Sequence, residues 1–223
     1  MQNIILKPNT QRAKTAILLI YCVLVLEIIS LISGYFQYDL LNTISEGYFI
    51  STETANSNDT REQIVGILYL ITFIISAITF IQWFRRAYYN LHLVHNNLLF
   101  TEGWAAGSWF VPIISLFRPY QIMKEMYEKT QNVIKRKTGT APYLSTKNLS
   151  IWWTLWIINN LIGQFQYRYS SDAVVVDDLI LGTQISLLSN IIGIPLALIT
   201  VKVIKDYSAI ETILNTPEIL KKE

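Results

Sequence analysis

Apolar residues in this chain gather in long blocks instead of alternating with polar ones. Four blocks reach, or nearly reach, the length of a membrane-spanning helix, because about 30 Å of hydrocarbon takes roughly 20 apolar residues at about 1.5 Å each. The pattern therefore predicts an all-α, polytopic membrane helix bundle that forms a single integral membrane domain over residues 1–223. The predicted spans are residues 15–36, 64–84, 149–165 and 179–201.

A fifth apolar block, residues 104–117, has only fourteen residues and is interrupted by Pro112. As a helix it would measure about 21 Å, which is short for a crossing. We therefore expect a re-entrant or interfacial segment here, with a full fifth span as the alternative. Apolar side chains recur at helical spacing on both sides of it, which predicts two amphipathic cytoplasmic helices at residues 85–99 and 119–137.

The basic residues predict the orientation of the spans. Sixteen of the eighteen Lys and Arg residues lie in the N-terminal tail, between the second and third spans, or in the C-terminal tail. The other two connections, residues 37–63 and 166–178, hold eight acidic residues but only Arg61 and Arg168. By the positive-inside rule the basic segments face the cytoplasm, so both termini are predicted to be cytoplasmic.

Composition argues against several other classes of protein. Hydrophobic residues make up 52% of the chain and charged residues 15%, and the net charge is +2, so a nucleic-acid-binding domain is excluded. Cys22 is the only cysteine, which excludes a secreted disulfide scaffold. The first apolar block is about twice the length of a signal-peptide core, so we expect it to remain as a signal anchor.

Glu27 is the single ionisable side chain inside the predicted spans. Burying such a group in the membrane costs a few kcal/mol, so it must face protein or water. Counting along the helices places five other polar residues near the same depth, and these define a mid-membrane polar layer. Such a layer could bind a proton or cation; alternatively, Glu27 is protonated and the amides hold the helices together. The other members are Thr72, Ser76, Asn159, Asn160 and Asn190.

A second candidate site lies at the predicted cytoplasmic ends of the spans. Arg side chains suit phosphate oxyanions, and Trp and Tyr favour the headgroup layer. We expect a pocket for a lipid headgroup or for an acidic segment of a membrane-protein partner, with ordinary interfacial anchoring as the alternative. Its predicted residues are Arg85, Arg86, Trp104, Trp109, Arg118 and Tyr120.

A short basic run, Lys135, Arg136 and Lys137, ends the second amphipathic helix. Lipid-recognition clusters usually hold about four to eight basic residues, so these three favour a solvated face over specific lipid binding.

Motifs for catalysis and metal binding are missing from the sequence. It has no nucleophile elbow, no Gly-rich phosphate loop, no HExxH and no paired carboxylates in one membrane layer. His92 and His95 are three residues apart, but too few further ligands accompany them. We therefore expect a non-enzymatic protein without catalytic residues, metal or cofactor.

Two further stretches of the chain form a recognisable pattern. The first stretch comprises Trp83, Phe84, Arg85, Arg86, Ala87, Tyr88, Asn90 and Leu91, and the second Gly103, Trp104, Ala105, Trp109, Phe110, Pro112, Ile113, Leu116, Arg118, Pro119, Tyr120 and Gln121. Together they resemble a family of bacterial membrane proteins catalogued as domain of unknown function 4328. The resemblance implies a multi-pass bacterial inner-membrane domain and no particular activity. Ser115 departs from the pattern, because many relatives carry Asn there.

These observations lead to a hypothesis about function. The leading one is a four-span inner-membrane protein whose cytoplasmic face binds lipid headgroups or a membrane-protein partner. Membrane lipids are the expected partners, with another membrane protein or a second copy of the chain as further ones. The first alternative is a small transporter or channel that uses the layer around Glu27. An intramembrane enzyme acting on lipid is weaker, because no acid, base and nucleophile gather near the cytoplasmic face.

Overall fold

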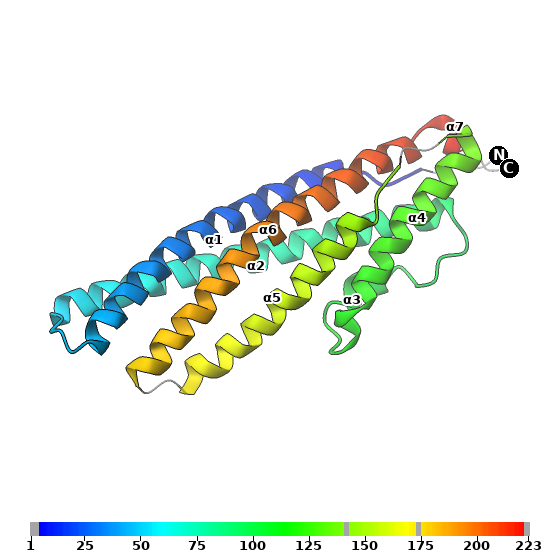
Figure 1. Ribbon diagram of the computed structural model, residues 1–223. Helices are drawn as coiled ribbons and strands as arrows, with labels where there is room; N and C mark the ends of the chain where they lie inside the picture. The colour runs from blue at the N-terminus through cyan, green and yellow to red at the C-terminus, as the bar shows by residue number, and fades with distance from the viewer. Residues whose placement is uncertain (1–4, 141–142, 173–174, 221–223) are drawn as a thin grey trace. The chain divides into compact units, whose positions relative to one another are not determined.

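The computed structural model describes residues 5–140, 143–172 and 175–220, and all regular structure in these ranges is helical (Figure 1). The prediction of an all-α chain is therefore confirmed. The elements in chain order are α1 (Thr10–Ser45), α2 (Thr52–Val94), α3 (Trp104–Gly107), the 3-10 helix η1 (Ile114–Leu116), α4 (Arg118–Thr138), α5 (Lys147–Asp172), α6 (Val176–Leu214) and α7 (Pro217–Leu220).

Three helices in the described part of the chain, α1, α2 and α6, are long and apolar enough to cross a membrane. Large apolar side chains are exposed along all three, for example Ile32 of α1, Ile71 of α2 and Leu198 of α6. A soluble protein rarely exposes so much contiguous apolar surface, whereas a helix that faces lipid does. The chain is therefore a membrane protein.

Helix α5 contains the fourth predicted span, residues 149–165, but is not one of these three helices. It has 26 residues and a length of about 39 Å, which is sufficient to cross. Its middle carries Asn159, Asn160 and Gln164, whose amides lower its hydropathy. The expected helix is present, and its crossing of the membrane stays a prediction.

The helices extend beyond the predicted spans. Because α1 continues to Ser45 and α2 begins at Thr52, the predicted outer connection 37–63 is largely helical. Gly47 in the short remaining link has a φ of 86°, which glycine adopts without steric cost, and its N–H donates to the Ile44 carbonyl at the end of α1. Helix α2 also runs on to Val94, so residues 85–94 continue that helix and do not form the separate amphipathic helix expected there.

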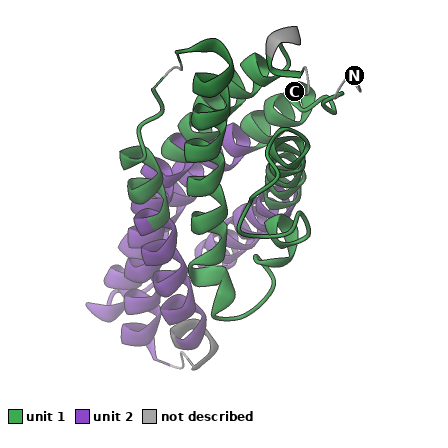
Figure 2. Ribbon diagram, turned by 90° about the vertical axis from the view of Figure 1, so that its right-hand side faces the viewer, with its two compact units in different colours: residues 1–19, 76–153, 199–223 green, residues 20–75, 154–198 purple. Residues whose placement is uncertain are grey.

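The chain divides into two compact units (Figure 2). Unit 1 comprises residues 1–19, 76–153 and 199–223, and unit 2 comprises residues 20–75 and 154–198. The unit boundaries fall inside α1, α2, α5 and α6. Unit 2 holds most of each predicted span, and unit 1 holds α3, η1, α4 and α7.

The core of unit 1 is aromatic. Trp83 of α2 is fully buried, and its ring meets Tyr207 of α6 edge-on with 6.2 Å between centroids. Tyr127 of α4 stacks on Tyr207 at 6.0 Å and donates its hydroxyl to the Val203 carbonyl at 3.0 Å. Helix α4 buries the apolar positions that its helical spacing indicated: Ile122, Met123, Met126, Tyr127, Val133 and Ile134.

The predicted re-entrant or interfacial block, residues 104–117, contains two short pieces, α3 and η1, and no helix of spanning length. Between them Ile113 has a φ of 66°, which is strained for a β-branched residue and breaks the helical path. The full fifth span considered as the alternative is therefore wrong for this segment. Pro119 stands in the first turn of α4, where its missing N–H leaves no helical bond unmade.

Candidate functional site

Arg118, at the start of α4, lies among three aromatic rings of unit 1. Its guanidinium carbon is 4.2 Å from the centroid of Phe100, 5.5 Å from that of Trp104 and 5.8 Å from that of Phe117. The Nε atom is buried and has no hydrogen-bond partner in the described part of the chain. The rings fix the orientation of the guanidinium by cation–π contact without neutralising its charge. The structure thus brings together two predicted site residues, Arg118 and Trp104.

Two other predicted residues, Trp109 and Tyr120, meet through Trp153 of α5. The Trp153 ring contacts Trp109 edge-on and stacks on Tyr120, with 6.1 Å between centroids in both pairs. The Tyr120 hydroxyl lies 3.1 Å from Ser150 Oγ. These contacts give both residues a structural role in the aromatic core of unit 1.

The remaining predicted residues, Arg85 and Arg86, already have partners. Arg85 forms an exposed ion pair with Glu102 at 3.0 Å. The guanidinium carbon of Arg86 lies 6.0 Å from the centroid of the Tyr89 ring. The positive charge of Arg86 also acts to lower the pKa of Glu211 in α6. The contacts of the six predicted residues thus fall into separate groups, and Arg118 is the member best placed to meet an anion.

An exposed apolar loop lies directly before Arg118 in the chain. Phe110 and Ile113 are 75% and 74% exposed, a degree of exposure that is costly for such large side chains in water. Val111, Leu116 and Phe117 are also exposed. A guanidinium beside apolar side chains matches the boundary between lipid headgroups and acyl chains.

In unit 2, Glu27 of α1 is 4% exposed and accepts a hydrogen bond of 2.7 Å from the Tyr69 hydroxyl of α2. Its carboxylate also lies against the backbone of α6 at Gly193. A Cβ added to Gly193 would approach three atoms of this carboxylate to under 3.0 Å. The lack of a side chain at Gly193 therefore provides the space that the Glu27 carboxylate occupies.

The other members of the predicted layer are dispersed. Asn159 accepts a hydrogen bond from Ser189 Oγ at 3.2 Å, whereas Asn160 is exposed and donates to the Trp156 carbonyl of its own helix at 2.8 Å. Asn190 is buried. Thr72 is half-buried in unit 2, and the buried Ser76 belongs to unit 1.

Unit 2 also contains a polar pocket. The pocket has a volume of about 550 Å³ and lies between α2, α5 and α6. Tyr69, which binds Glu27, is part of its wall. Its lining residues are Tyr69, Phe73, Asn159, Asn160, Gly163, Gln164, Gln166, Tyr167, Arg168 and Ser189.

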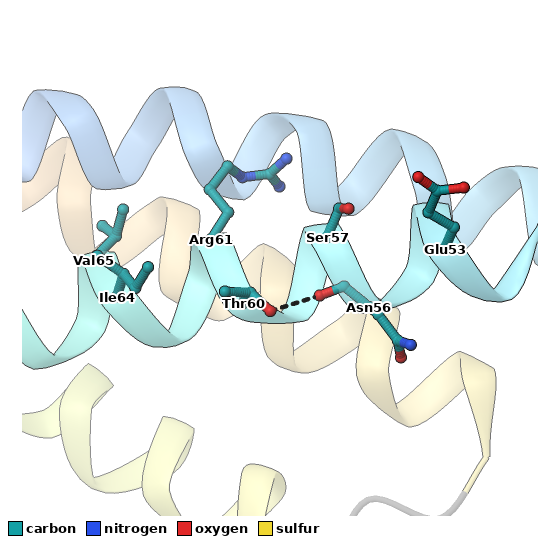
Figure 3. A pocket seen from close by; sticks show the side chains of 7 residues that line it. All are labelled: Glu53, Asn56, Ser57, Thr60, Arg61, Ile64 and Val65. Carbon is teal, nitrogen blue, oxygen red and sulfur yellow. Dashed lines mark hydrogen bonds between the residues drawn. The ribbon is translucent and has the colours of Figure 1, made fainter.

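A wider hollow of about 790 Å³ follows the start of α2 and is lined by residues between Glu53 and Val65 (Figure 3). Its cation, Arg61, donates to the Ser33 carbonyl at 3.1 Å and to Asn58 Oδ1 at 2.6 Å. It also pairs with Glu62 at 3.3 Å. Because these acceptors use the guanidinium, Arg61 joins α1 to α2 and is poorly placed to hold a ligand.

Two buried polar networks were not anticipated from the sequence. In unit 1, Glu211 of α6 accepts hydrogen bonds from the side-chain amides of Asn9 and Asn90 at 2.9 and 2.8 Å. Burial raises the pKa of Glu211, although Asn90, Asn9 and Arg86 oppose that rise. In unit 2, Tyr69 was missed as the partner of Glu27 because a lone Tyr in an apolar block has no local signature.

The family comparison covers most of the chain. The model described as "Domain of unknown function (DUF4328)" matches residues 46–209. The chain belongs to this family. Comparison of this chain with curated proteins and with solved structures found no match.

The matched DUF4328 region contains both stretches that carry the resemblance. In the first, six side chains are buried in unit 1, which explains their spacing as a packing requirement. In the second, Arg118 and Trp104 form the cation–π contact. The buried six are Trp83, Phe84, Ala87, Tyr88, Asn90 and Leu91.

Proposed function

We propose that this protein is a non-enzymatic, four-span protein of a bacterial inner membrane, with α5 as the fourth span and both termini in the cytoplasm. The length of α5 and the concentration of basic residues on one side of the spans support this topology. The segment 104–117 then enters the cytoplasmic interface and leaves on the same side. Its exposed Phe110 and Ile113 suit insertion among acyl chains.

The proposed function is binding of anionic lipid headgroups at Arg118. The observation that carries it is the guanidinium held over Phe100 and Trp104, directly after an exposed apolar loop. The loop anchors at the level of the acyl chains, and the positioned guanidinium meets the phosphate above them. Arg85 is a weaker candidate because Glu102 neutralises it.

Lipid retention in native mass spectrometry tests this proposal. The full-length protein is released from nanodiscs of phosphatidylglycerol or phosphatidylcholine, and the bound lipids are counted. We expect wild type to keep phosphatidylglycerol preferentially and R118Q to lose that preference. R85Q is the matched control and should behave as wild type.

Three results would overturn the proposal. Equal retention of both lipids by wild type would remove the anion specificity, and an unchanged preference in R118Q would remove Arg118. A protein that co-purifies with wild type but not with R118Q, in place of lipid, would favour a membrane-protein partner or a second copy of the chain.

A second candidate function is transport through the polar layer of unit 2. It is favoured by one observation: Tyr69 contacts the buried Glu27 and also lines the polar pocket. A carboxylate inside the membrane is a candidate site for a proton or small cation, and here its hydrogen-bond partner Tyr69 lines a polar pocket. In proteoliposomes, this candidate predicts proton or cation flux that E27Q abolishes and Y69F reduces. Equal flux in wild type and E27Q would exclude it.

A further inference from the structure

A basic pocket of about 540 Å³ lies in unit 1 between the end of α2 and the second half of α4. It is lined by His95, Lys129, Asn132, Lys135 and Arg136. Lys129 is eleven residues beyond Arg118 in α4, or about 16 Å along the helix, so the pocket is separate from the proposed headgroup site.

The helix geometry of α4 places its lining residues together. Lys129, Asn132 and Arg136 follow one another at intervals of three and four residues, which puts them on one face. His95 reaches this face because its backbone N–H still bonds the Leu91 carbonyl at 2.9 Å, which extends the last turn of α2. The tertiary fold thus places His95 and Lys129 beside Lys135 and Arg136, two members of the short basic run that ends α4.

A hydrogen bond selects the tautomer of the neutral His95 imidazole. Its Nδ1 accepts a hydrogen bond from the Asn97 backbone N–H at 3.2 Å. A neutral imidazole that accepts at Nδ1 carries its proton on Nε2, which is then a donor. Nε2 is therefore the ring nitrogen that remains to serve an acceptor in the pocket.

The electrostatics of the pocket favour an anion. Burial lowers the pKa of His95, and the charges of Lys129 and Arg136 lower it further, as does His92 to a smaller extent. The opposing acid is Glu125, which is occupied by the Tyr88 hydroxyl at 2.8 Å and the Leu99 N–H at 2.7 Å. None of the residues that line the pocket is acidic. The positive charges therefore repel one another until an anion enters.

We propose that this pocket binds a phosphate-bearing anion. Arg136 presents a planar fork that matches two phosphate oxygens, and Lys129 and Lys135 supply compact charges. The volume exceeds that of a single phosphate, which leaves room for a second phosphate or for a polar group that contacts Asn132. This ligand is either a soluble phosphorylated compound of the cytoplasm or the headgroup of an anionic lipid.

Inorganic pyrophosphate is the probe for the shared chemistry. Its affinity is measured by titration calorimetry on the full-length protein in phosphatidylcholine nanodiscs. We expect K129Q and R136Q each to weaken binding about tenfold or more, because each removes a charge-assisted hydrogen bond. K124Q is the matched control: Lys124 is on the same helix, is exposed, and pairs with Glu128 at 3.8 Å.

The pH dependence gives an independent readout. An anion favours the protonated form of His95, although the added proton on Nδ1 replaces the hydrogen bond from the Asn97 N–H. Binding should therefore take up a proton, and affinity should rise as pH falls through the pKa of His95. H95Q should reduce this dependence to that of pyrophosphate itself. K124Q should keep the pH dependence of wild type, because Lys124 does not line the pocket.

A second arm identifies the source of the ligand. Phosphatidylglycerol that is retained by wild type, lost in K129Q and displaced by pyrophosphate would identify a lipid headgroup. Pyrophosphate binding without such retention would identify a soluble phosphate compound. The proposal is overturned if wild type binds neither probe, or if K124Q weakens binding as much as K129Q, since the effect would then reflect net charge alone.

Discussion

Gly193→Ala is the sharpest test of the packing around Glu27. The added methyl group would approach three atoms of the Glu27 carboxylate to under 3.0 Å. The carboxylate must therefore shift, and a shift away from Gly193 should weaken its hydrogen bond with Tyr69. We expect the free energy of unfolding to fall by about 1–3 kcal/mol, the usual cost of overpacking, despite the better helix propensity of Ala.

Gly66→Ala provides the matched control. Gly66 is also helical, but a Cβ placed on it meets nothing within 4 Å. This substitution should be neutral or stabilise the protein by up to about 1 kcal/mol, because only helix propensity changes. The assay is unfolding of the purified protein in mild detergent by titration with a denaturing detergent, followed by circular dichroism.

Repeating Gly193→Ala in a Glu27→Ala background tests whether the contact with Glu27 causes the loss of stability. Removing the carboxylate removes the clash, so Gly193→Ala should then behave like Gly66→Ala. The double-mutant cycle should give a coupling of about 2 kcal/mol, well above the about 0.3–0.5 kcal/mol scatter of independent sites. If Gly193→Ala destabilises both backgrounds equally, the assigned contact between Gly193 and Glu27 is refuted.

Three further predictions concern unit 1. Tyr88→Phe should lower the free energy of unfolding by about 1–3 kcal/mol, because the buried Glu125 carboxylate loses a donor, and thermal unfolding would measure this. The pKa of Glu211 is higher in the folded protein than in the unfolded chain, so its contribution to stability is complete below the unfolded value and is lost as pH rises through the folded value. The midpoint of thermal unfolding of wild type should therefore decrease as pH increases through this range, and Glu211→Gln should reduce that decrease. Arg85→Gln should change stability by less than about 1 kcal/mol, since its ion pair with Glu102 is exposed; a larger loss of unfolding free energy would contradict that assignment.

Much of the local structure follows from the spacing of residues. The apolar side chains that α4 buries are those that recur at helical intervals. Three of the four predicted spans lie in helices long and apolar enough to cross a membrane. The prediction of a separate amphipathic helix at residues 85–99 was wrong, because no helix breaker follows Phe84 and α2 continues to Val94 in unit 1.

Only part of the candidate site could be predicted from the sequence. Arg118 and Trp104 were both anticipated, because Arg and Trp at the end of an apolar block favour the interface. The ion pair of Arg85 was not, since Glu102 lies seventeen residues further along the chain and its pairing depends on a loop. Tyr69 and Glu27 are likewise 42 residues apart, on different helices.

The sequence by itself determined that this is a helical membrane protein, because hydropathy and helical periodicity are sums over neighbouring residues and need no knowledge of the fold. Only the tertiary structure decided which polar groups meet. The rotation of each helix about its axis and the path of each loop set those contacts, and they brought Glu27 against Gly193 and His95 beside Lys129. Partners that meet across helices leave no local trace in the chain, so chemistry that depends on them emerges only when the helices pack.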